Sequence, residues 1–385
     1  MLDFTFKNPT KILFGKNRIE DIKNEIPSGK KVLITYGGGS IKKSGLLDRV
    51  KKNLERYSLT EFGGIEPNPT YETLMKGVEA ARTAKADFIL AVGGGSVIDG
   101  TKFIAAAVNY KGDPWEILMT YGSKIKSAIP FGTVLTLPAT GSEMNSSSVI
   151  TNKALHAKLP FSNPLVYPVF SVLEPETTYT LPAKQIGNGV VDTFVHIMEQ
   201  YMTYPVDAKV QDRFAEGLLL TLIEEGPKAL LQPENYDIRA NLMWCATMAL
   251  NGLIGSGVPQ DWATHMIGHE ITALHGVDHA RTLAIVLPSL MKIKKDEKKG
   301  KLLQYGERVW GITDGSEDER IELAIKKTGD FFKAMGVGIR LSDYGIAEKE
   351  IKIITGQLKD HGMTQLGEHK DITPDVAEKI LTLNL

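Results

Sequence analysis

The chain has 385 residues, of which 42% are hydrophobic and 24% are charged, and its formal net charge is -1. This balance excludes long-range electrostatic attraction to nucleic acid or to an anionic membrane, and it favours a small molecule or a second copy of the chain as partner. The single cysteine excludes an internal disulfide, and the lack of a signal region or of an apolar run of ~18 residues predicts a cytoplasmic protein.

The first half of the chain alternates short β-rich runs with helical patterns. Strands are expected over 31–36, 87–92 and 131–137, and helices over 41–56, 69–85 and 96–109. This alternation is typical of βαβ units in a mostly parallel sheet, whose ligands lie at the carboxyl ends of the strands. The stretch 149–173 is extended and broken by prolines, and we expect it to form a small antiparallel appendage.

After Leu181-Pro182 the pattern changes to helices. They are expected over 184–202, 207–231, 235–254, 260–272 and 279–294, with several more to the end of the chain. Because single cores stop growing at roughly 250–300 residues, two domains are expected. The boundary is placed near Pro182, which gives an α/β domain over 1–182 and an all-α domain over 183–385.

Two glycine clusters each follow a predicted strand and precede a predicted helix, Gly37-Gly38-Gly39-Ser40 and Gly93-Gly94-Gly95-Ser96. Glycines let a phosphate approach the backbone, and the following helix offers unpaired N–H groups, so a pyrophosphate is the expected ligand. Neither cluster is a G-x-G-x-x-G fingerprint. The alternative is a pair of tight turns with a Ser96–Asp99 capping box. At a third strand end, 136–145 supplies hydroxyls and an amide that suit a nicotinamide ribose.

Four of the eight histidines fall within fifteen residues, at His265, His269, His275 and His279. Upstream, Asp192 and His196 stand four apart in a helical run, so they project from one face about one turn apart. One carboxylate with two or three imidazoles would bind a divalent transition metal, Fe(II) or Zn(II). Spacing does not choose among the clustered histidines, because 265/269 and 275/279 are both i, i+4 pairs. A structural role in hydrogen bonding is the alternative for any one of them.

On these motifs the chain resembles the iron-containing (group III) alcohol dehydrogenase family, and within it the NADPH-dependent aldehyde reductase and butanol dehydrogenase branch. The likeness runs nearly end to end, through Pro67–Thr70, Gly93–Asp99, Thr140–Glu143, Gly189–His196 and the histidine stretch up to Pro288. The glycine motifs are shared with dehydroquinate synthase and glycerol dehydrogenase relatives. The resemblance implies a dehydroquinate synthase-like fold, with a Rossmann-like dinucleotide-binding domain over 1–182 and a metal-binding and substrate domain over 183–385.

The resemblance also implies a role for individual residues. It makes Asp192, His196, His265 and His279 the metal ligands, while His269 lines the substrate cleft and is our candidate proton relay. It gives the dinucleotide the contacts Asn68, Gly94, Gly95, Ser96, Asp99, Thr136 and Thr140, with Asn145, Ser147 and Lys158 as further contacts. For Lys158 an ordinary surface position is the alternative. As in the family's dimers, Phe4–Phe6 and Lys11–Phe14 are expected to pair at a sheet edge with a second subunit, giving a homodimer.

Cofactor choice is read from one position. The NAD-preferring relatives follow the general rule for dinucleotide-binding domains. In them an acidic side chain after an early strand binds the ribose 2′-OH and would repel a phosphate. Here that place holds Gly37, Gly38, Gly39 and Ser40, with Lys42 or Lys43 close by, which predicts NADP(H).

The expected activity is metal-dependent, NADP(H)-linked interconversion of small uncharged aldehydes and primary alcohols, because apolar residues such as Trp262, Met266 and Leu274 surround the histidines. The alternatives are an NADH-preferring butanol dehydrogenase of the same family and, more remotely, a non-oxidative dehydroquinate synthase-like enzyme, which would need basic groups around an anionic substrate. A metallohydrolase is suggested by the spacing of His265 and His269, but the chain lacks the glutamate base of the H-E-x-x-H motif. A nucleotide-binding protein without catalysis is the remaining alternative.

Overall fold

The computed structural model describes residues 1–385, which form two compact units. The sheet unit comprises Lys7–Leu181 and Pro233–Thr247, and the helical unit comprises Met1–Phe6, Pro182–Gln232 and Met248–Leu385. Each unit thus includes a short piece from the other half of the sequence. None of the helices combines the length and the apolar character that a membrane crossing requires.

The sheet unit is built on six strands in the order β1-β8-β5-β4-β2-β3, and every neighbouring pair is parallel. The strands are β1 (Lys11–Phe14), β2 (Lys31–Tyr36), β3 (Ser58–Phe62), β4 (Phe88–Gly93), β5 (Phe131–Leu135) and β8 (Phe170–Leu173). The predicted α/β architecture with a mostly parallel sheet is confirmed. The carboxyl ends of β5, β4 and β2 are adjacent, so the loops that follow them share one edge of the sheet.

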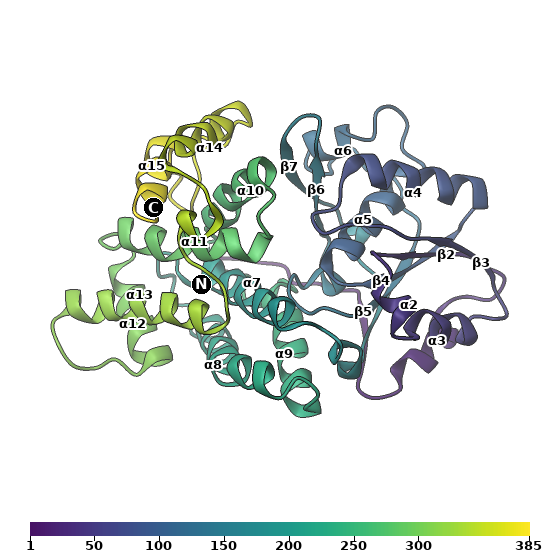
Figure 1. Cartoon of the computed structure of the whole chain (residues 1–385), viewed down its shortest axis with the longest axis horizontal. Helices are drawn as coiled ribbons and strands as arrows, with labels where there is room; N and C mark the ends of the chain where they lie inside the picture. The colour runs from purple at the N-terminus through teal and green to yellow at the C-terminus, as the bar shows by residue number, and fades with distance from the viewer. The chain divides into compact units, whose positions relative to one another are not determined.

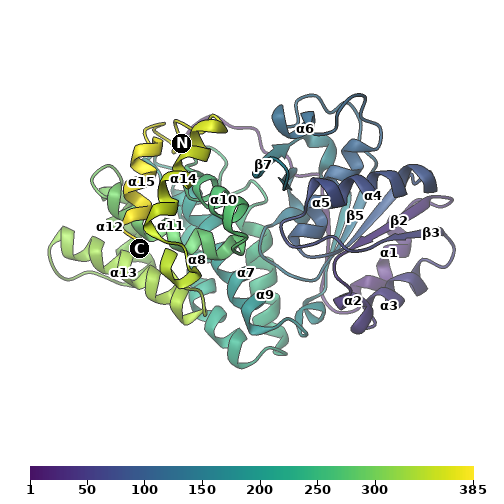
Figure 2. The ribbon, with the colours of Figure 1, turned by 45° about the horizontal axis from the view of Figure 1, so that its top comes forward.

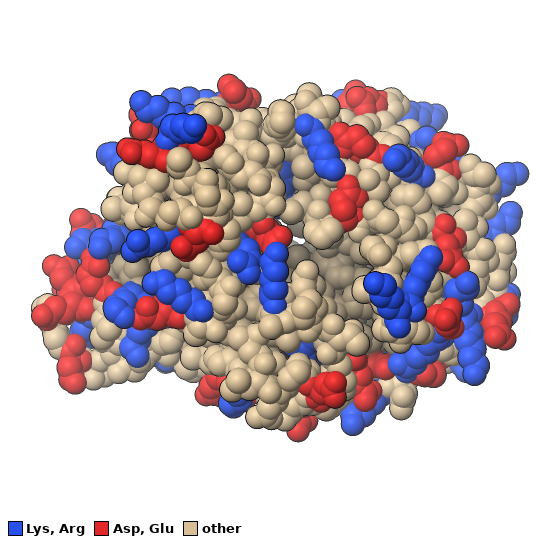
Figure 3. Space-filling view, viewed as in Figure 1, with Lys and Arg blue, Asp and Glu red and all other residues tan.

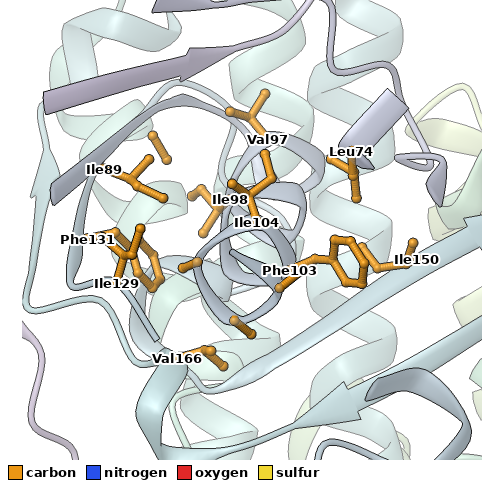
Figure 4. Close-up of a cluster of buried hydrophobic side chains, with 14 of the residues drawn as sticks. Leu74, Ile89, Val97, Ile98, Phe103, Ile104, Ile129, Phe131, Ile150 and Val166 are labelled. Atoms are coloured by element: carbon orange, nitrogen blue, oxygen red, sulfur yellow. The ribbon is translucent and has the colours of Figure 1, made fainter. Parts of the chain in front are cut away.

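Helices cover both faces of this sheet, as Figure 2 shows with α4 and α5 on one side and α1, α2 and α3 on the other. Alternate strand residues point to opposite faces. Thus Ile89 and Ala91 join one buried cluster, whereas Leu90 and Val92 join the other. Figure 4 shows the first cluster, in which side chains of α5 such as Phe103 lie beside Ile150 of β6. Both faces of β4 are therefore buried, which explains its unbroken apolar run.

The helices of the sheet unit connect these strands. They are α1 (Ile22–Glu25), α2 (Ser40–Lys43), α3 (Leu46–Asn53), α4 (Tyr71–Ala84), α5 (Gly95–Ala107) and α6 (Glu116–Met119), with α9 (Tyr236–Ala249) contributing most of its length, and the 3₁₀ turns η1 (Arg18–Asp21), η2 (Ser142–Met144), η3 (Pro164–Val166) and η4 (Pro175–Thr178). The helix expected over 41–56 is wrong as a single element. Gly45 adopts a left-handed conformation with φ 74° and separates α2 from α3.

The proline-rich stretch is partly an antiparallel appendage. Strands β6 (Ser147–Asn152) and β7 (Ala157–Ser162) form a two-stranded antiparallel sheet, as expected. The rest of the expectation is wrong, because β8 lies in the main sheet between β1 and β5. All four residues of β8 are buried, which suits a central parallel strand. Strand β3, which the sequence did not predict, lies at the opposite edge and is half-exposed.

The helical unit contains eight helices. They are α7 (Ala183–Tyr201), α8 (Lys209–Leu231), α10 (Ala263–His275), α11 (His279–Ile293), α12 (Lys299–Trp310), α13 (Glu317–Ala334), α14 (Glu348–Asp360) and α15 (Pro374–Thr382), with the 3₁₀ turn η5 (Leu341–Tyr344). Figure 1 shows them in teal to yellow. Helix α7 packs against α8 and α11, and α10 packs against α11. The predicted all-helical second part is confirmed.

Candidate functional site

Three helices of the helical unit bring the predicted metal ligands together. Helix α7 presents Asp192 and His196 one turn apart, α10 presents His265, and α11 begins at His279. The first three of these side chains are buried, and the side chain of His279 is 21% exposed. Asp192 and His196 are about seventy residues from the histidine stretch in sequence. The packing of α7 on α10 and α11 brings them together in space.

The distances within this group suit a shared ion. One ligand atom from each of Asp192, His265 and His279 lies within 4.8 Å of the others. Oδ1 of Asp192 is 3.8 Å from Nε2 of His279 and 3.7 Å from Nδ1 of His196. These distances are too long for hydrogen bonds. They match two ligands that each lie about 2.0–2.2 Å from one ion, whose separation is then at most roughly 4.4 Å.

The fourth predicted ligand, His196, adjoins this triad. Its ring centroid is 4.6 Å from that of His265, and its Nδ1 faces the carboxylate of Asp192. Burial lowers the pKa of His196 to about 4, although the nearby Asp192 carboxylate opposes the shift. The imidazole is therefore neutral at pH 7, which is the form that binds a metal. The donors present, one carboxylate and three imidazoles, fit Fe(II) or Zn(II).

The remaining clustered histidines lie beside the triad. His269 follows His265 by one turn of α10 and is buried, and its ring centroid is 5.1 Å from that of His279 and 6.2 Å from that of His265. It stands outside the set of mutually close ligand atoms. His275 is the last residue of α10, before Gly276 in a left-handed conformation. The packing thus separates histidines that spacing alone left equivalent.

Glu199 is a functional candidate that the sequence reasoning missed. It lies on α7 one turn after His196, is 2% exposed, and its Oε2 contacts Nδ1 of His265. Its Oε1 accepts hydrogen bonds from the N–H groups of Thr264 (2.7 Å) and His265 (3.4 Å). Burial, and then the nearby Asp261 carboxylate, raises the pKa of Glu199, and the two backbone bonds oppose that rise. Its spacing of seven residues from Asp192 could have placed it on the same helix face.

The two glycine clusters lie where the sheet unit would bind a dinucleotide. Gly37–Ser40 links β2 to α2, with Gly39 at φ 104°, and Gly94 precedes the first turn of α5. A Cβ atom on Gly95 would lie 2.4 Å from Oγ1 of Thr140, so only glycine allows this approach. Thr136 follows β5, and its N–H donates to the carbonyl of Gly93 (3.0 Å). The predicted phosphate and nicotinamide contacts thus meet at one edge of the sheet.

The capping-box alternative for Ser96 and Asp99 is wrong. Helix α5 has no side-chain cap at its N-terminus. Instead, Oδ1 of Asp99 accepts from Oγ of Ser142 (2.5 Å) and Oδ2 accepts from the N–H of Val149 (2.9 Å). The carboxylate of Asp99 therefore holds the loop that follows Thr140 against α5.

Lys102, also missed from the sequence, completes this network. It is fully buried in α5, and its ammonium donates to Oγ of Ser142 (2.7 Å), Oδ1 of Asn145 (2.8 Å) and the carbonyl of Ser147 (2.7 Å). Burial lowers the pKa of Lys102 to about 8, against the opposing attraction of Asp99 and Glu143. Asn145 and Ser147, predicted as cofactor contacts, are thus held in place by one side chain. Its position three residues after Asp99 and directly before the apolar run Phe103–Ala107 was the available signal.

The predicted contacts Asn68 and Lys158 also meet. Nζ of Lys158 donates to Oδ1 of Asn68 (2.9 Å), and Lys158 is only 3% exposed, so the alternative of an ordinary surface lysine is wrong. Asn68 has φ 53°, a left-handed conformation that asparagine tolerates better than most residues. This bond joins β7 to the loop before α4.

The comparisons with known proteins decide the family. The model of the iron-containing alcohol dehydrogenase family matches residues 9–175, and the model of the C-terminal part of the Fe-containing alcohol dehydrogenase family matches residues 187–382. The chain belongs to the iron-containing alcohol dehydrogenase family. The resemblance inferred from its motifs is confirmed, and the chain is an oxidoreductase of this family.

Relatives and solved structures cover the whole chain. The NADPH-dependent aldehyde reductase YqhD of Escherichia coli is 62% identical over 382 residues, 99% of each chain. A probable NADH-dependent butanol dehydrogenase of Bacillus subtilis is 43% identical over 390 residues, 100% of each chain. The substrate- and cofactor-free structure of YqhD matches with a TM-score of 0.93 and 60% identity over 100% of each chain. The NADH-dependent butanol dehydrogenase A of Thermotoga maritima matches with a TM-score of 0.95 and 34% identity over 100% of this chain and 99% of that one.

Proposed function

We propose that this enzyme reduces small uncharged aldehydes to primary alcohols with NADPH, and that it holds a divalent metal, Fe(II) or Zn(II), through Asp192, His196, His265 and His279. The observation that carries the proposal is the convergence of a carboxylate and imidazoles at ion-sharing distances within an iron-containing alcohol dehydrogenase. The 62% identity to an NADPH-dependent aldehyde reductase supports the choice of substrate and cofactor.

The chain's own residues hold and orient the reacting groups. When bound, the ion would polarise the carbonyl oxygen and NADPH would supply the hydride. Asp192 contributes a negative charge and the imidazoles contribute neutral donors, so the site leaves a net positive charge for the substrate oxygen. His269, buried beside His279, is placed to pass a proton to that oxygen and thereby release the alcohol.

The sheet unit supplies the cofactor contacts. We assign the pyrophosphate to the start of α5, where Gly94, Gly95 and Ser96 offer backbone N–H groups at the positive end of a helix. Thr136, Thr140, Asn145 and Ser147 surround the nicotinamide half, and the Asn68–Lys158 pair contacts the adenosine ribose. Asp99 acts by holding the loop at Ser142 and Val149.

We assign the 2′-phosphate of NADPH to Gly37, Gly38, Gly39 and Ser40. No carboxylate stands in this turn, and Lys42 and Lys43 lie in the short helix that follows. Basic side chains gather over α2 and α3 in Figure 3. This environment attracts a phosphate, which favours NADPH over the NADH-preferring alternative.

The Gly38→Asp variant tests this assignment. A Cβ atom at Gly38 meets no other atom within 4 Å, and Gly38 is exposed, so a side chain can be added at this position. The added carboxylate would repel the phosphate and accept the 2′-OH of NADH instead. We expect kcat/KM for NADPH to fall by roughly tenfold or more, the effect of about 1.4 kcal/mol, with little loss for NADH. An equal loss for both cofactors would remove this turn from cofactor choice.

The oligomeric state of the enzyme and its cellular compartment are also proposals. Strand β1 is an edge strand, and Phe4 and Phe6 are exposed, which supports a homodimer formed through this region. The single buried cysteine, Cys245, suits a reducing compartment, and we place the enzyme in the cytoplasm. Sedimentation of the purified chain tests the dimer, since a monomer at micromolar concentration would contradict it.

One experiment tests the proposed reaction. The metal-free protein is loaded separately with Fe(II) and Zn(II), and the oxidation of NADPH and NADH is followed over a panel of aldehydes. We expect one metal at least to restore NADPH oxidation with uncharged aldehydes. The Asp192→Ala variant should bind no metal and show no turnover, while its affinity for NADPH stays close to that of the unmodified enzyme. Full activity of the metal-free protein, with no metal added, would contradict the proposal.

A further inference from the structure

We propose that Glu199 is a positioning residue for the metal site, which orients the ring of His265 and fixes the tautomer whose Nε2 faces the ion. The inference rests on the proposed metal site, because it takes His265 as a ligand. Glu199 itself supplies no ligand atom to the Asp192–His265–His279 triad. It acts on the ion only through the imidazole that it holds.

The carboxylate of Glu199 holds both the ring and the backbone of His265. Its Oε2 contacts Nδ1 of the ring, and its Oε1 accepts from the backbone N–H groups of Thr264 and His265. All three contacts are buried. One side chain from α7 thus fixes where α10 begins and how its first histidine is turned.

The start of α10 needs this acceptor. Trp262, at the N-cap, adopts a left-handed conformation with φ 62° and its side chain accepts no capping hydrogen bond. The first N–H groups of a helix have no partner within the helix. Oδ1 of Asp261 accepts from Ala263 (2.9 Å), and Glu199 accepts from the next two residues. The carboxylates of Asp261 and Glu199 together accept hydrogen bonds from the first three N–H groups of α10.

The buried side chain of Lys298 also stabilises the junction between the end of α7 and the start of α10. The ammonium of Lys298 donates to Oδ2 of Asp261 (2.9 Å), to the carbonyl of Met202 (2.8 Å) and to Oε1 of Glu368 (2.5 Å). The N–H of Asp261 donates to the carbonyl of Glu199 (2.9 Å). The end of α7 and the start of α10 are therefore fixed relative to each other, and the carboxylate of Glu199 stays in line with the ring.

This geometry sets the chemistry of His265. A neutral imidazole carries one N–H and one lone pair. If Nδ1 donates to the carboxylate, the lone pair lies on Nε2, which is then the nitrogen that can bind a metal. Carboxylates that orient ligating histidines in this way typically contribute roughly 10–100-fold to metal affinity.

The Glu199→Gln variant separates this role from that of helix capping. The side-chain oxygen of glutamine can still accept from Thr264 and His265, so its NH₂ group faces Nδ1. Two donors cannot share one hydrogen bond, and the ring is driven to the tautomer that protonates Nε2. That tautomer has no lone pair on the nitrogen that faces the ion. We expect Zn(II) affinity to fall by roughly 10–100-fold.

The chain offers a matched control on α10, the helix that carries His265. Glu270 is buried in α10, and its Oε1 pairs with Nδ1 of His361 (2.8 Å), a histidine outside the proposed ligand set. Glu270→Gln makes the same chemical change at the same kind of carboxylate–histidine pair. We expect it to leave the Zn(II) dissociation constant unchanged.

The experiment measures Zn(II) dissociation constants by chelator competition, using the full-length protein. The variants are Glu199→Gln, Glu270→Gln, His265→Ala and the double variant Glu199→Gln/His265→Ala. If Glu199 acts through His265, the Gln substitution weakens binding in the unmodified protein and adds little once His265 is absent. An equal loss in both backgrounds would assign Glu199 a merely structural role and overturn the proposal.

Nitrogen-15 NMR of the histidine-labelled, metal-free protein gives a second readout, whose decisive measurement uses the unmodified protein. We expect the ring of His265 to carry its proton on Nδ1 in the unmodified protein and on Nε2 in Glu199→Gln. A proton on Nε2 in the unmodified protein would overturn the proposal. If the unmodified protein bound no Zn(II) while its His265 kept the Nδ1 proton, the proposed metal site would fail and the hydrogen-bond assignment would stand.

Discussion

Replacing Lys102 by Met removes the one cation that holds the loop after Thr140. The three N–H groups of the ammonium meet three acceptors, Oγ of Ser142, Oδ1 of Asn145 and the carbonyl of Ser147, so each acceptor loses a charged donor in the variant. The Asp99 carboxylate also loses its neighbouring positive charge. Methionine fills most of the volume of the lysine stem.

The size of the loss follows from these contacts. Leaving a buried polar group without its hydrogen-bond partner typically costs about 1–3 kcal/mol. For a unit of 150–250 residues, each kcal/mol lowers the midpoint of thermal unfolding by about 2–4 °C. The sheet unit should therefore unfold roughly 2–12 °C lower, and NADPH affinity should fall because the loop no longer holds Asn145.

Scanning calorimetry and NADPH titration check the Lys102→Met prediction. The control is Lys76→Met, because Lys76 is exposed on α4 of the same unit; we expect it to change the unfolding free energy by less than about 0.5 kcal/mol. If Lys102→Met unfolded like the control and bound NADPH normally, the network would have no role in holding the loop.

The same substitution changes the dependence of stability on pH. Burial lowers the pKa of Lys102 to about 8 in the folded chain, from 10.5 as the ordinary value. Between these values the unfolded chain binds more protons than the folded chain, so this residue makes stability rise with pH. By pH 10 the gain is about 2–3 kcal/mol. Chemical unfolding from pH 8 to pH 10 should show this rise in the unmodified enzyme relative to Lys102→Met, and parallel profiles would refute it.

Two further substitutions test the site itself. In Gly95→Ala, the added Cβ atom would lie 2.4 Å from Oγ1 of Thr140, so we expect a loss of about 1–3 kcal/mol in the free energy of unfolding, together with weaker NADPH binding by calorimetric titration; unchanged binding would mean that the cofactor does not lie at this turn. In His269→Ala, we expect kcat to fall by roughly 10²-fold or more while bound metal stays at one ion per chain, and full activity would remove His269 from the proton path.

Much of the fold could be predicted because its signals are local. The buried runs at β2 and β4 and the change to helical periodicity after Pro182 were visible in the residues themselves. Strand β8 was misplaced because prolines at 160, 164 and 168 resemble those of an irregular appendage, whereas its partners β1 and β5 are distant in sequence. Local patterns do not encode such pairings.

The candidate site was predictable in its residue types but not in its internal contacts. Spacing placed Asp192 and His196 on one helix face, yet it could not tell which clustered histidine would meet them, since that depends on how α10 and α11 pack on α7. Glu199 and Lys102 were missed for the same reason. The first reaches His265 across 66 residues and the second reaches Asn145 across 43, distances that no periodicity reports.

Anomalous X-ray diffraction at the zinc edge, on crystals of the enzyme loaded with Zn(II), tests the central claim most directly. The account predicts one strong peak within about 2.0–2.2 Å of a carboxylate oxygen of Asp192 and of imidazole nitrogens from His196, His265 and His279. A peak among other residues, or crystals with full Zn(II) loading and no peak between these side chains, would contradict it.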